Sequence, residues 1–216
     1  MKQLLKLSLA LACSVAAVAT AQAAISVSAT PGAAIYAGPT PTYNFDTPTP
    51  FPGSNIFNTH TGNHARPLGS TGGFGAVGFS DGSPAILSLA SFTQIGSISL
   101  LWGSIDTYNT LTVLDKLGNA LQSFTGSQIA ALVPGFANGN QSSLITNPLV
   151  TLKFTGGTED NIGGLRFEST ANAFEFDNIT ISAVPEPATW LMMIAGFGMI
   201  GGMMRRRNGN EGLATA

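Results

Sequence analysis

Short runs of alternating apolar and polar residues recur along the middle of the chain, and they predict β-strands. Alternation with a period of two places every second side chain on the same face of a sheet. In the longest run the alternation changes phase at Asp177 and Asn178, which predicts a β-bulge or the start of a strand at that point. The expected strands are residues 25–28, 96–102, 110–114, 149–154 and 173–182.

Short pairs and triplets rich in glycine, asparagine and aspartate separate these runs and predict turns. Short strands at this spacing are typical of a β-sandwich. One short helix is expected over residues 127–132, with Ser127 as its N-cap and Pro134 beyond its end. Six prolines between Pro31 and Pro52 predict an extended entry segment, because proline is excluded from helix interiors.

The composition excludes several classes of function. Charged residues make up 9% of the chain, against about 25% in an average soluble domain. The single cysteine, Cys13, excludes a disulfide scaffold and a paired-cysteine metal or redox site. The net charge is −2 without a basic stripe, so nucleic acid is not an expected partner. Residues 24–183 carry four basic and nine acidic side chains, which suits an exported domain.

Residues 1–23 have the pattern of a secretory signal peptide. Two lysines precede an apolar stretch over residues 7–19, and Ala21-Gln22-Ala23 supplies the small residues that signal peptidase requires. Cleavage is expected after Ala23. An uncleaved membrane anchor is one alternative, although the apolar stretch is short for a span. A lipoprotein acylated at Cys13 is another.

A second apolar stretch, residues 188–204, lies near the C-terminus and predicts a single transmembrane helix. As a helix it is about 25 Å long, which barely spans a hydrocarbon core. Trp190 suits the membrane interface, and the cluster Arg205, Arg206 and Arg207 stops translocation and holds residues 208–216 in the cytoplasm. Residues 24–183 would then lie outside the membrane.

The tripeptide Pro185-Glu186-Pro187 precedes this stretch, and membrane anchoring alone does not require it. An anchor that dimerises through Gly198 and Gly202 is the plain alternative. The tripeptide, Trp190, the glycine- and methionine-rich helix and the arginine cluster together resemble the PEP-CTERM sorting signal of Gram-negative bacteria, over residues 184–207. The resemblance implies recognition by an exosortase, a membrane cysteine transpeptidase that cuts near the tripeptide and passes the protein to the cell surface or extracellular matrix.

The local chemistry agrees with cleavage at this point. Pro185 and Pro187 keep the segment extended and outside the helix, so that a protease at the membrane surface can reach it. The family pattern is not matched in full, since Leu191 stands where the proteobacterial subtype usually has alanine.

Two segments of the middle region also resemble PEP-CTERM surface proteins. Residues 97–111 contain the pattern Trp-Gly-Ser-x-Asp-x-Tyr-Asn, and residues 174–187 look like the final strand that runs into their sorting signal. The resemblance implies a jelly-roll sandwich similar to carbohydrate-binding modules. The expected fold is therefore all-β, with a jelly-roll-like β-sandwich ectodomain over residues 24–183.

Trp102, Asp106 and Tyr108 form a candidate ligand site, because aromatic faces beside carboxylate groups suit sugar binding. The apolar run before Trp102 favours the alternative that this tryptophan belongs to the core and that residues 106–109 form a turn.

Asp46 and Asp177 are candidate metal ligands, since each follows a phenylalanine at or near an expected strand. The likeness to jelly-roll modules implies a structural Ca²⁺ held by oxygens of the first and last strands. Turn chemistry at strand ends is the alternative for both residues. His60 and His64 are four residues apart, but nearby glycine and asparagine disfavour a helix, so a solvated loop is expected there.

No catalytic motif is recognisable, so we expect that the protein is not an enzyme. It is an exported surface or extracellular-matrix protein that is anchored in the membrane transiently. Signal peptidase, an exosortase, the membrane and extracellular polysaccharide are its expected partners. The alternatives are a lectin-like, calcium-dependent carbohydrate-binding module and a permanently anchored periplasmic protein.

Overall fold

The computed structural model describes residues 23–135, 137–184 and 187–210, and strands dominate this part of the chain. They form one sheet of six strands and one of four, and every pairing is antiparallel. In order across the larger sheet, the strands are β1 (Ala24–Thr30), β8 (Leu149–Thr155), β5 (Ile95–Gly103), β10 (Phe174–Ala183), β3 (Phe74–Val77) and β2 (Ile56–Phe57). The smaller sheet consists of β4 (Ala85–Ser88), β9 (Ile162–Ser169), β6 (Asn109–Asp115) and β7 (Ala120–Thr125).

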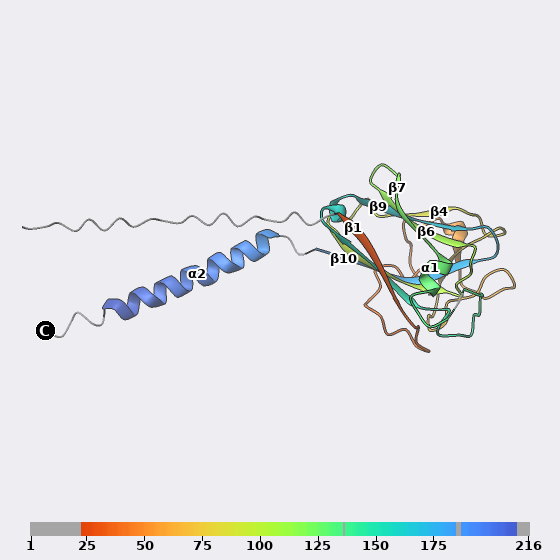
Figure 1. Ribbon diagram of the computed structural model, residues 1–216, viewed down its shortest axis with the longest axis horizontal. Coiled ribbons are helices and arrows are strands. Elements are labelled where there is room, and N and C mark those ends of the chain that lie inside the picture. The colour runs from red at the N-terminus through yellow and green to blue at the C-terminus, as the bar shows by residue number, and fades with distance from the viewer. Residues whose placement is uncertain (1–22, 136, 185–186, 211–216) are drawn as a thin grey trace, which may run out of the picture.

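Strands β3 to β10 wind as a jelly roll. Four of them lie side by side in the order β3-β10-β5-β8, and the other four lie in the order β4-β9-β6-β7 (Figure 1). This is the strand order of two Greek keys wrapped into two facing sheets. Strands β1 and β2 extend the larger sheet at its two edges. The predicted all-β sandwich is confirmed.

Aromatic side chains fill the space between the sheets. Phe167 of β9 and Phe176 of β10 stack with their ring centroids 3.8 Å apart, which joins the two sheets directly. Trp102 of β5 stacks on Phe174 of β10 at 4.1 Å. All four side chains are fully buried. Rings of this size supply a large share of the hydrophobic stabilisation of a core.

The chain between β1 and β3, residues 31–73, wraps around the larger sheet, and we call it the covering segment. Its Thr42 and Tyr43 amides donate to the Ile179 carbonyl, so that Tyr43 pairs with β10 in the plane of the sheet. Its Phe45 and Phe51 rings enter the core. Its Ala65 amide donates to the Glu175 side chain on the outer face. The prolines of this segment keep it irregular and extended from residue 31 to 52, as predicted.

The change of phase in the last strand predicted either a β-bulge or the start of a strand, and the structure shows a bulge. The pairing of β10 with β5 shifts register between Asp177 and Thr180, and Asn178 has a positive φ of 52°. The bulge explains why Phe174, Phe176 and Ile179 all contribute to the core although they do not follow a single alternation.

The helix expected over residues 127–132 lies slightly earlier. Helix α1 spans Gly126–Ala130, and its N-cap is Thr125 instead of Ser127. The Thr125 hydroxyl accepts the Gln128 amide, while the Gln128 side chain accepts the Thr125 amide. This reciprocal capping box satisfies two amides that would otherwise lack partners, so it selects Thr125. Short 3-10 turns occur at Gly53–Asn55 and Thr158–Asp160.

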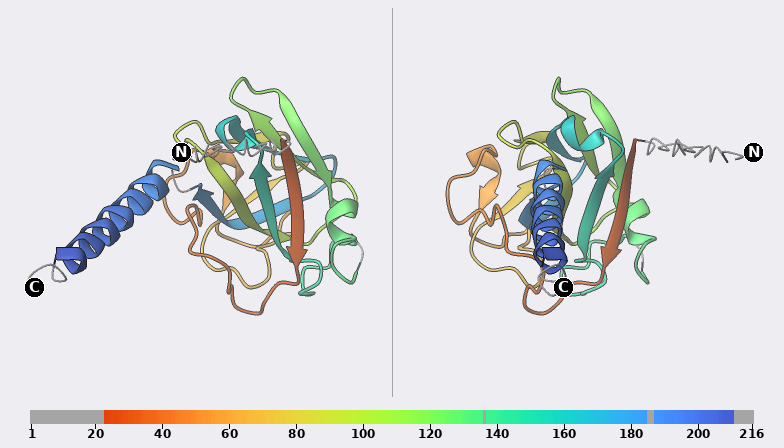
Figure 2. Two further views of the ribbon diagram at one scale, coloured as in Figure 1. Left: turned by 60° about the vertical axis from the view of Figure 1, so that its left-hand side comes forward. Right: turned by 90° about the vertical axis from the view of Figure 1, so that its left-hand side faces the viewer.

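Both ends of the sandwich domain lie at the same end of the larger sheet. Ser26 of β1, Lys153 of β8, Ser97 of β5 and Ser182 of β10 pair in one continuous row. The chain therefore enters β1 and leaves β10 at the same end of the sheet, with β8 and β5 between the two strands (Figure 2). The expected signal peptide falls almost wholly outside the described residues, whose first member, Ala23, directly precedes β1.

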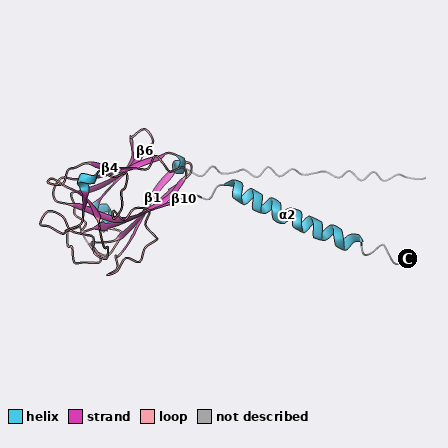
Figure 3. Cartoon of the chain, turned by 180° about the vertical axis from the view of Figure 1, so that it is seen from behind, coloured by secondary structure: helices cyan, strands magenta, loops and turns pink. Residues whose placement is uncertain are grey.

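A long helix, α2 (Pro187–Asn210), follows β10 and extends away from the sandwich in the views of Figures 1 and 3. It covers the predicted apolar stretch and continues past the arginine cluster. Within the described part of the chain, no helix combines the length and the apolar character needed to cross a membrane. The predicted transmembrane helix is thus present as a helix but is not supported as a span.

Loss of one inter-sheet ring tests the core. We expect Phe176→Ala to lower the free energy of unfolding by about 3–5 kcal/mol, because it removes the ring that stacks on Phe167 and leaves a cavity. Phe79→Ala is the matched control, since 85% of the Phe79 side chain is exposed. Urea unfolding of both variants measures the difference. Equal, small effects would show that the two sheets do not depend on this stack.

Candidate functional site

Four loops at one end of the sandwich enclose a strongly polar hollow of about 200 Å³, which we call the polar pocket. The loop between β5 and β6 contributes Ser104, Asp106 and Tyr108, and the loop between β9 and β10 contributes Asn172. Glu175, near the start of β10, also lines this pocket. The pocket therefore lies at the end of β10 that is remote from α2.

Asp106 and Tyr108, two of the three predicted ligand-site residues, do meet in this pocket. The Tyr108 hydroxyl donates to Asp106 Oδ2 at 2.6 Å and lies 2.8 Å from the Asn172 carbonyl oxygen. Partial burial raises the pKa of the Asp106 carboxyl, although the Tyr108 bond opposes this shift. Burial and the nearby Asp106 carboxylate raise the pKa of Tyr108. The phenol therefore stays protonated and acts as a donor.

Glu175 is the buried member of the pocket. Its Oε1 accepts the Ala65 amide at 2.9 Å, and its Oε2 accepts the Ser104 hydroxyl at 2.6 Å. Burial raises the pKa of the Glu175 carboxyl to about 7, against the lowering effect of these two bonds, and the charge of Asp106 adds to the rise. Glu175 thus ties the covering segment to the floor of the pocket.

Trp102, the third predicted residue, does not line the pocket. Its side chain is fully buried against Phe174, so the core alternative holds for it. Sequence reasoning missed Glu175 and Asn172. The signal for Glu175 was available, because an acidic residue between two phenylalanines of an alternating strand must lie on the opposite face of the sheet.

The predicted metal ligands Asp46 and Asp177 also lie close together, beside the outer face of the larger sheet. Asp177 is fully buried; its Oδ1 accepts the Asn178 amide at 2.6 Å, and its Oδ2 has no hydrogen-bond partner among the described residues. Burial raises the pKa of Asp177 to about 7, the charge of Asp46 adds to the rise, and Arg66 lowers it. Asp46 is exposed, and its Oδ1 accepts the Gly73 amide at 2.6 Å.

The unpartnered oxygen of Asp177 needs either a proton or a cation, because a bare buried carboxylate is costly. Carboxylate oxygens are the hard ligands that Ca²⁺ prefers, so the donor chemistry fits the predicted ion. In this structure, however, the two Asp46 oxygens accept the Gly73 amide and the Asn44 side chain. Bound Ca²⁺ would neutralise Asp46 and Asp177 together. The described residues contain no group of three or more acidic, histidine or cysteine side chains placed to hold a metal, so backbone oxygens or water would complete the ligand set.

The two histidines behave differently from the expected solvated loop. His60 is exposed, but His64 is buried and stacks on Phe57 with ring centroids 3.9 Å apart. His64 Nδ1 lies 3.2 Å from Asp81 Oδ2. The phenylalanine ring and the carboxylate hold His64 in the fold, so the solvated-loop prediction is wrong for this residue.

The sorting segment follows the sandwich directly. Strand β10 ends at Ala183, and α2 begins at Pro187. The prediction that both prolines stay outside the helix is therefore wrong for Pro187, because proline is well accommodated as the first residue of a helix. Pro185 and Glu186 of the tripeptide lie outside the described residues. Trp190 is exposed near the start of α2, and Arg205 is exposed near its end, while Arg206 and Arg207 belong to the same helix.

The buried carboxyls predict how stability depends on pH. Glu175 and Asp177 both have a folded-state pKa of about 7, above their ordinary values of 4.5 and 3.8. The folded state therefore binds their protons more tightly than the unfolded state. The resulting stabilisation is complete below about pH 4 and is lost as the pH rises through about 7.

We expect Asp177→Asn to reduce this loss and to make the protein about 2 kcal/mol more stable than the wild type near pH 8. Asp160→Asn, at an exposed carboxyl, is the control and should leave the pH dependence unchanged. Urea unfolding across the pH range measures the free energy of unfolding, and an unchanged pH dependence in Asp177→Asn would contradict the assignment.

Excess calcium should raise the wild-type melting temperature near pH 8 and leave that of Asp177→Asn unaffected. Identical melting with calcium and with chelator would exclude the ion.

Comparison with known proteins adds one finding at the C-terminus. The PEP-CTERM protein-sorting motif matches residues 183–207, one residue longer than the segment expected from the sequence. No curated protein and no solved structure gives a match to the chain. The motif supports exosortase-dependent sorting of a surface protein. The chain thus carries a PEP-CTERM sorting motif directly after its β-sandwich.

Proposed function

We propose that this is an exported, non-enzymatic protein of the cell surface or extracellular matrix, sorted by an exosortase through its C-terminal motif. One observation carries the proposal: the motif begins at residue 183, the last residue of β10. Cleavage near Pro185–Pro187 would leave every strand and the whole aromatic core in place. The sandwich is then the delivered product, and residues beyond the cut serve as an address.

The surface of α2 agrees with a transient association with the membrane. Its large apolar side chains are exposed; Trp190, for example, is 55% exposed, and Ile194 and Phe197 are 68% exposed. A helix that leaves such side chains in contact with water has no role in the core of the sandwich. Membrane lipid or the exosortase would cover them before the helix is removed.

The sorting proposal is tested on native protein from its host, with and without the exosortase. We expect the intact mass and the C-terminal peptide to show a chain that ends near Pro185–Pro187 only when the exosortase is present. Replacement of Pro185, Glu186 and Pro187 by alanine should prevent this cut, because it removes the residues that the exosortase recognises and lets the helix extend toward β10.

Pro50→Ala serves as the control, since Pro50 is an exposed proline of the covering segment, and this variant should be processed normally. A chain that keeps Arg205–Arg207 in both strains would instead indicate a resident membrane protein. In that case the Gly198–Gly202 face would be tested for dimerisation by cross-linking.

A second candidate function, glycan contact by the sandwich, is favoured by the polar pocket. Asp106 offers a carboxylate, Tyr108 an aromatic face and Asn172 an amide in one hollow, and groups of this kind bind sugar hydroxyls and the apolar faces of sugar rings. The pocket lies at the end of β10 remote from the sorting motif, where attachment would leave it free. Binding to a glycan array that Tyr108→Ala abolishes, while the thermal unfolding of the variant is unchanged, would support this role.

A further inference from the structure

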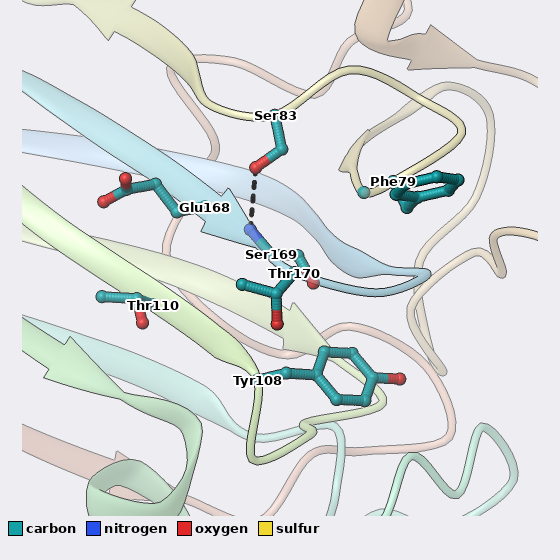
Figure 4. A pocket seen from close by; sticks show the side chains of 8 residues that line it. Phe79, Ser83, Tyr108, Thr110, Glu168, Ser169 and Thr170 are labelled. Atoms are coloured by element: carbon teal, nitrogen blue, oxygen red, sulfur yellow. Dashed lines mark hydrogen bonds between the residues drawn. The ribbon is translucent and has the colours of Figure 1, made fainter.

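A second hollow adjoins the polar pocket, and Tyr108 lines both. This outer pocket has a volume of about 440 Å³ and lies over the ends of β6 and β9 (Figure 4). Its walls include Phe79, Ser83, Tyr108, Thr110, Glu168 and Thr170. Thr110 and Glu168 face each other as a pair in the β6–β9 ladder. The two hollows are therefore neighbours on either side of one tyrosine.

The outer pocket has an aromatic side and a polar side. Figure 4 shows the rings of Phe79 and Tyr108 on one side of the pocket, with Thr170 between them, and Glu168 and Thr110 on the other. Phe79 is 85% exposed, so the fold itself gains little from this ring. An exposed ring opposite hydroxyl and carboxylate groups suits a ligand with one apolar face and many hydroxyls, and a sugar ring has both.

Hydrogen bonds fix the aromatic side in place. The Asn172 side chain accepts the Ser80 amide at 2.9 Å and donates to the Ser80 hydroxyl at 2.9 Å. The backbone oxygen of the same Asn172 lies 2.8 Å from the Tyr108 hydroxyl. The loop that carries Phe79 is thus tied to Tyr108 through one residue. A preformed surface of this kind loses less conformational entropy when a ligand binds.

The charge of the two pockets restricts the ligand further. Their described lining contains the carboxyls of Asp106, Glu168 and Glu175 and neither lysine nor arginine. The nearby Arg166 is already paired with Glu168 at 2.9 Å. A polyanion such as a uronate polymer would therefore meet like charges without a compensating base.

We propose that the polar pocket and the outer pocket form one groove across Tyr108 that binds an uncharged polysaccharide in extended form, with consecutive sugar units on the two sides of Tyr108. This proposal rests on the glycan contact proposed above and adds the ligand class and the direction of the chain. Phe79 supports the sugar in the outer pocket, and Asp106 and Gln141 contact the sugar in the polar pocket. The groove lies at the end of β10 remote from the sorting motif, where an extended polymer can pass.

The test uses the full chain and an array of neutral and uronate oligosaccharides of increasing length, followed by calorimetric titration. We expect neutral oligosaccharides to bind about tenfold or more tightly than the matching monosaccharide, since they occupy both pockets. Phe79→Ala should abolish this gain with length but retain the weak binding of the short sugar. Tyr108→Ala should weaken every neutral ligand, and Tyr108→Phe, which keeps the ring, should weaken them less.

Leu117→Ala is the matched control, because Leu117 is 87% exposed but lies in the turn between β6 and β7, away from both pockets. It should bind as the wild type does, and a cooperative thermal transition should show that every variant is folded. If neutral oligosaccharides bind no more tightly than the monosaccharide, only the single pocket is used and the groove is wrong. A gain with length that Phe79→Ala preserves also contradicts the groove, because the second sugar unit then lies elsewhere. Tighter binding of uronates overturns the ligand class. Absence of binding to every glycan overturns both the groove and the glycan contact.

Discussion

The rest of the structure depends on strand β10, which packs into the core on one face and buries two carboxyls on the other. On one face its phenylalanines stack against Phe167 and Trp102 and hold the two sheets together. On the other face it buries two carboxyls, and Glu175 binds the covering segment through the Ala65 amide. The core covers the first side, and the covering segment buries part of the second. Burial of an acidic face costs free energy, and the hydrogen bonds that Glu175 accepts from Ala65 and Ser104 offset part of this cost.

The same strand sets the distance between the two proposed functions. The polar pocket begins at Glu175, and the sorting motif begins at Ala183, so most of the strand, about 25 Å at the usual rise per residue, separates them. Processing at the motif therefore needs no change in the pocket. Glu175, at the pocket end of the strand, binds the covering segment through Ala65 and the β5–β6 loop through Ser104.

Much of the fold could be predicted from the sequence, because its main strands alternate clearly and its turns carry glycine and asparagine. The bulge at Asp177 was visible as a break in that alternation. Five strands were missed: β2, β3, β4, β7 and β9. Strand β3 is buried on both faces, β2 and β4 are short, β7 is mostly exposed, and β9 has two glycines directly after its first residue. The pairing of β3 and β9 depends on neighbours far away in the sequence, which local periodicity does not report.

The site could be predicted only in part. Asp106 and Tyr108 are two residues apart, and a local pattern was enough to find them. Glu175, Asn172 and Phe79 join them only through the jelly-roll topology, which brings three loops to one end. Trp102 was a candidate for the site but belongs to the core. It pairs with Phe176, and because paired residues point to the same face of a sheet, both side chains lie on the inner face.

The proposed function requires that the sandwich is delivered outside the cell with its groove exposed. The only cysteine of the sequence lies in the expected signal peptide, so Phe79→Cys would supply one label site in the delivered domain. A membrane-impermeant maleimide applied to intact host cells measures its accessibility directly. We expect the maleimide to label Phe79→Cys on intact cells when the exosortase is present. Labelling that appears only after the cells are broken would contradict the proposed function.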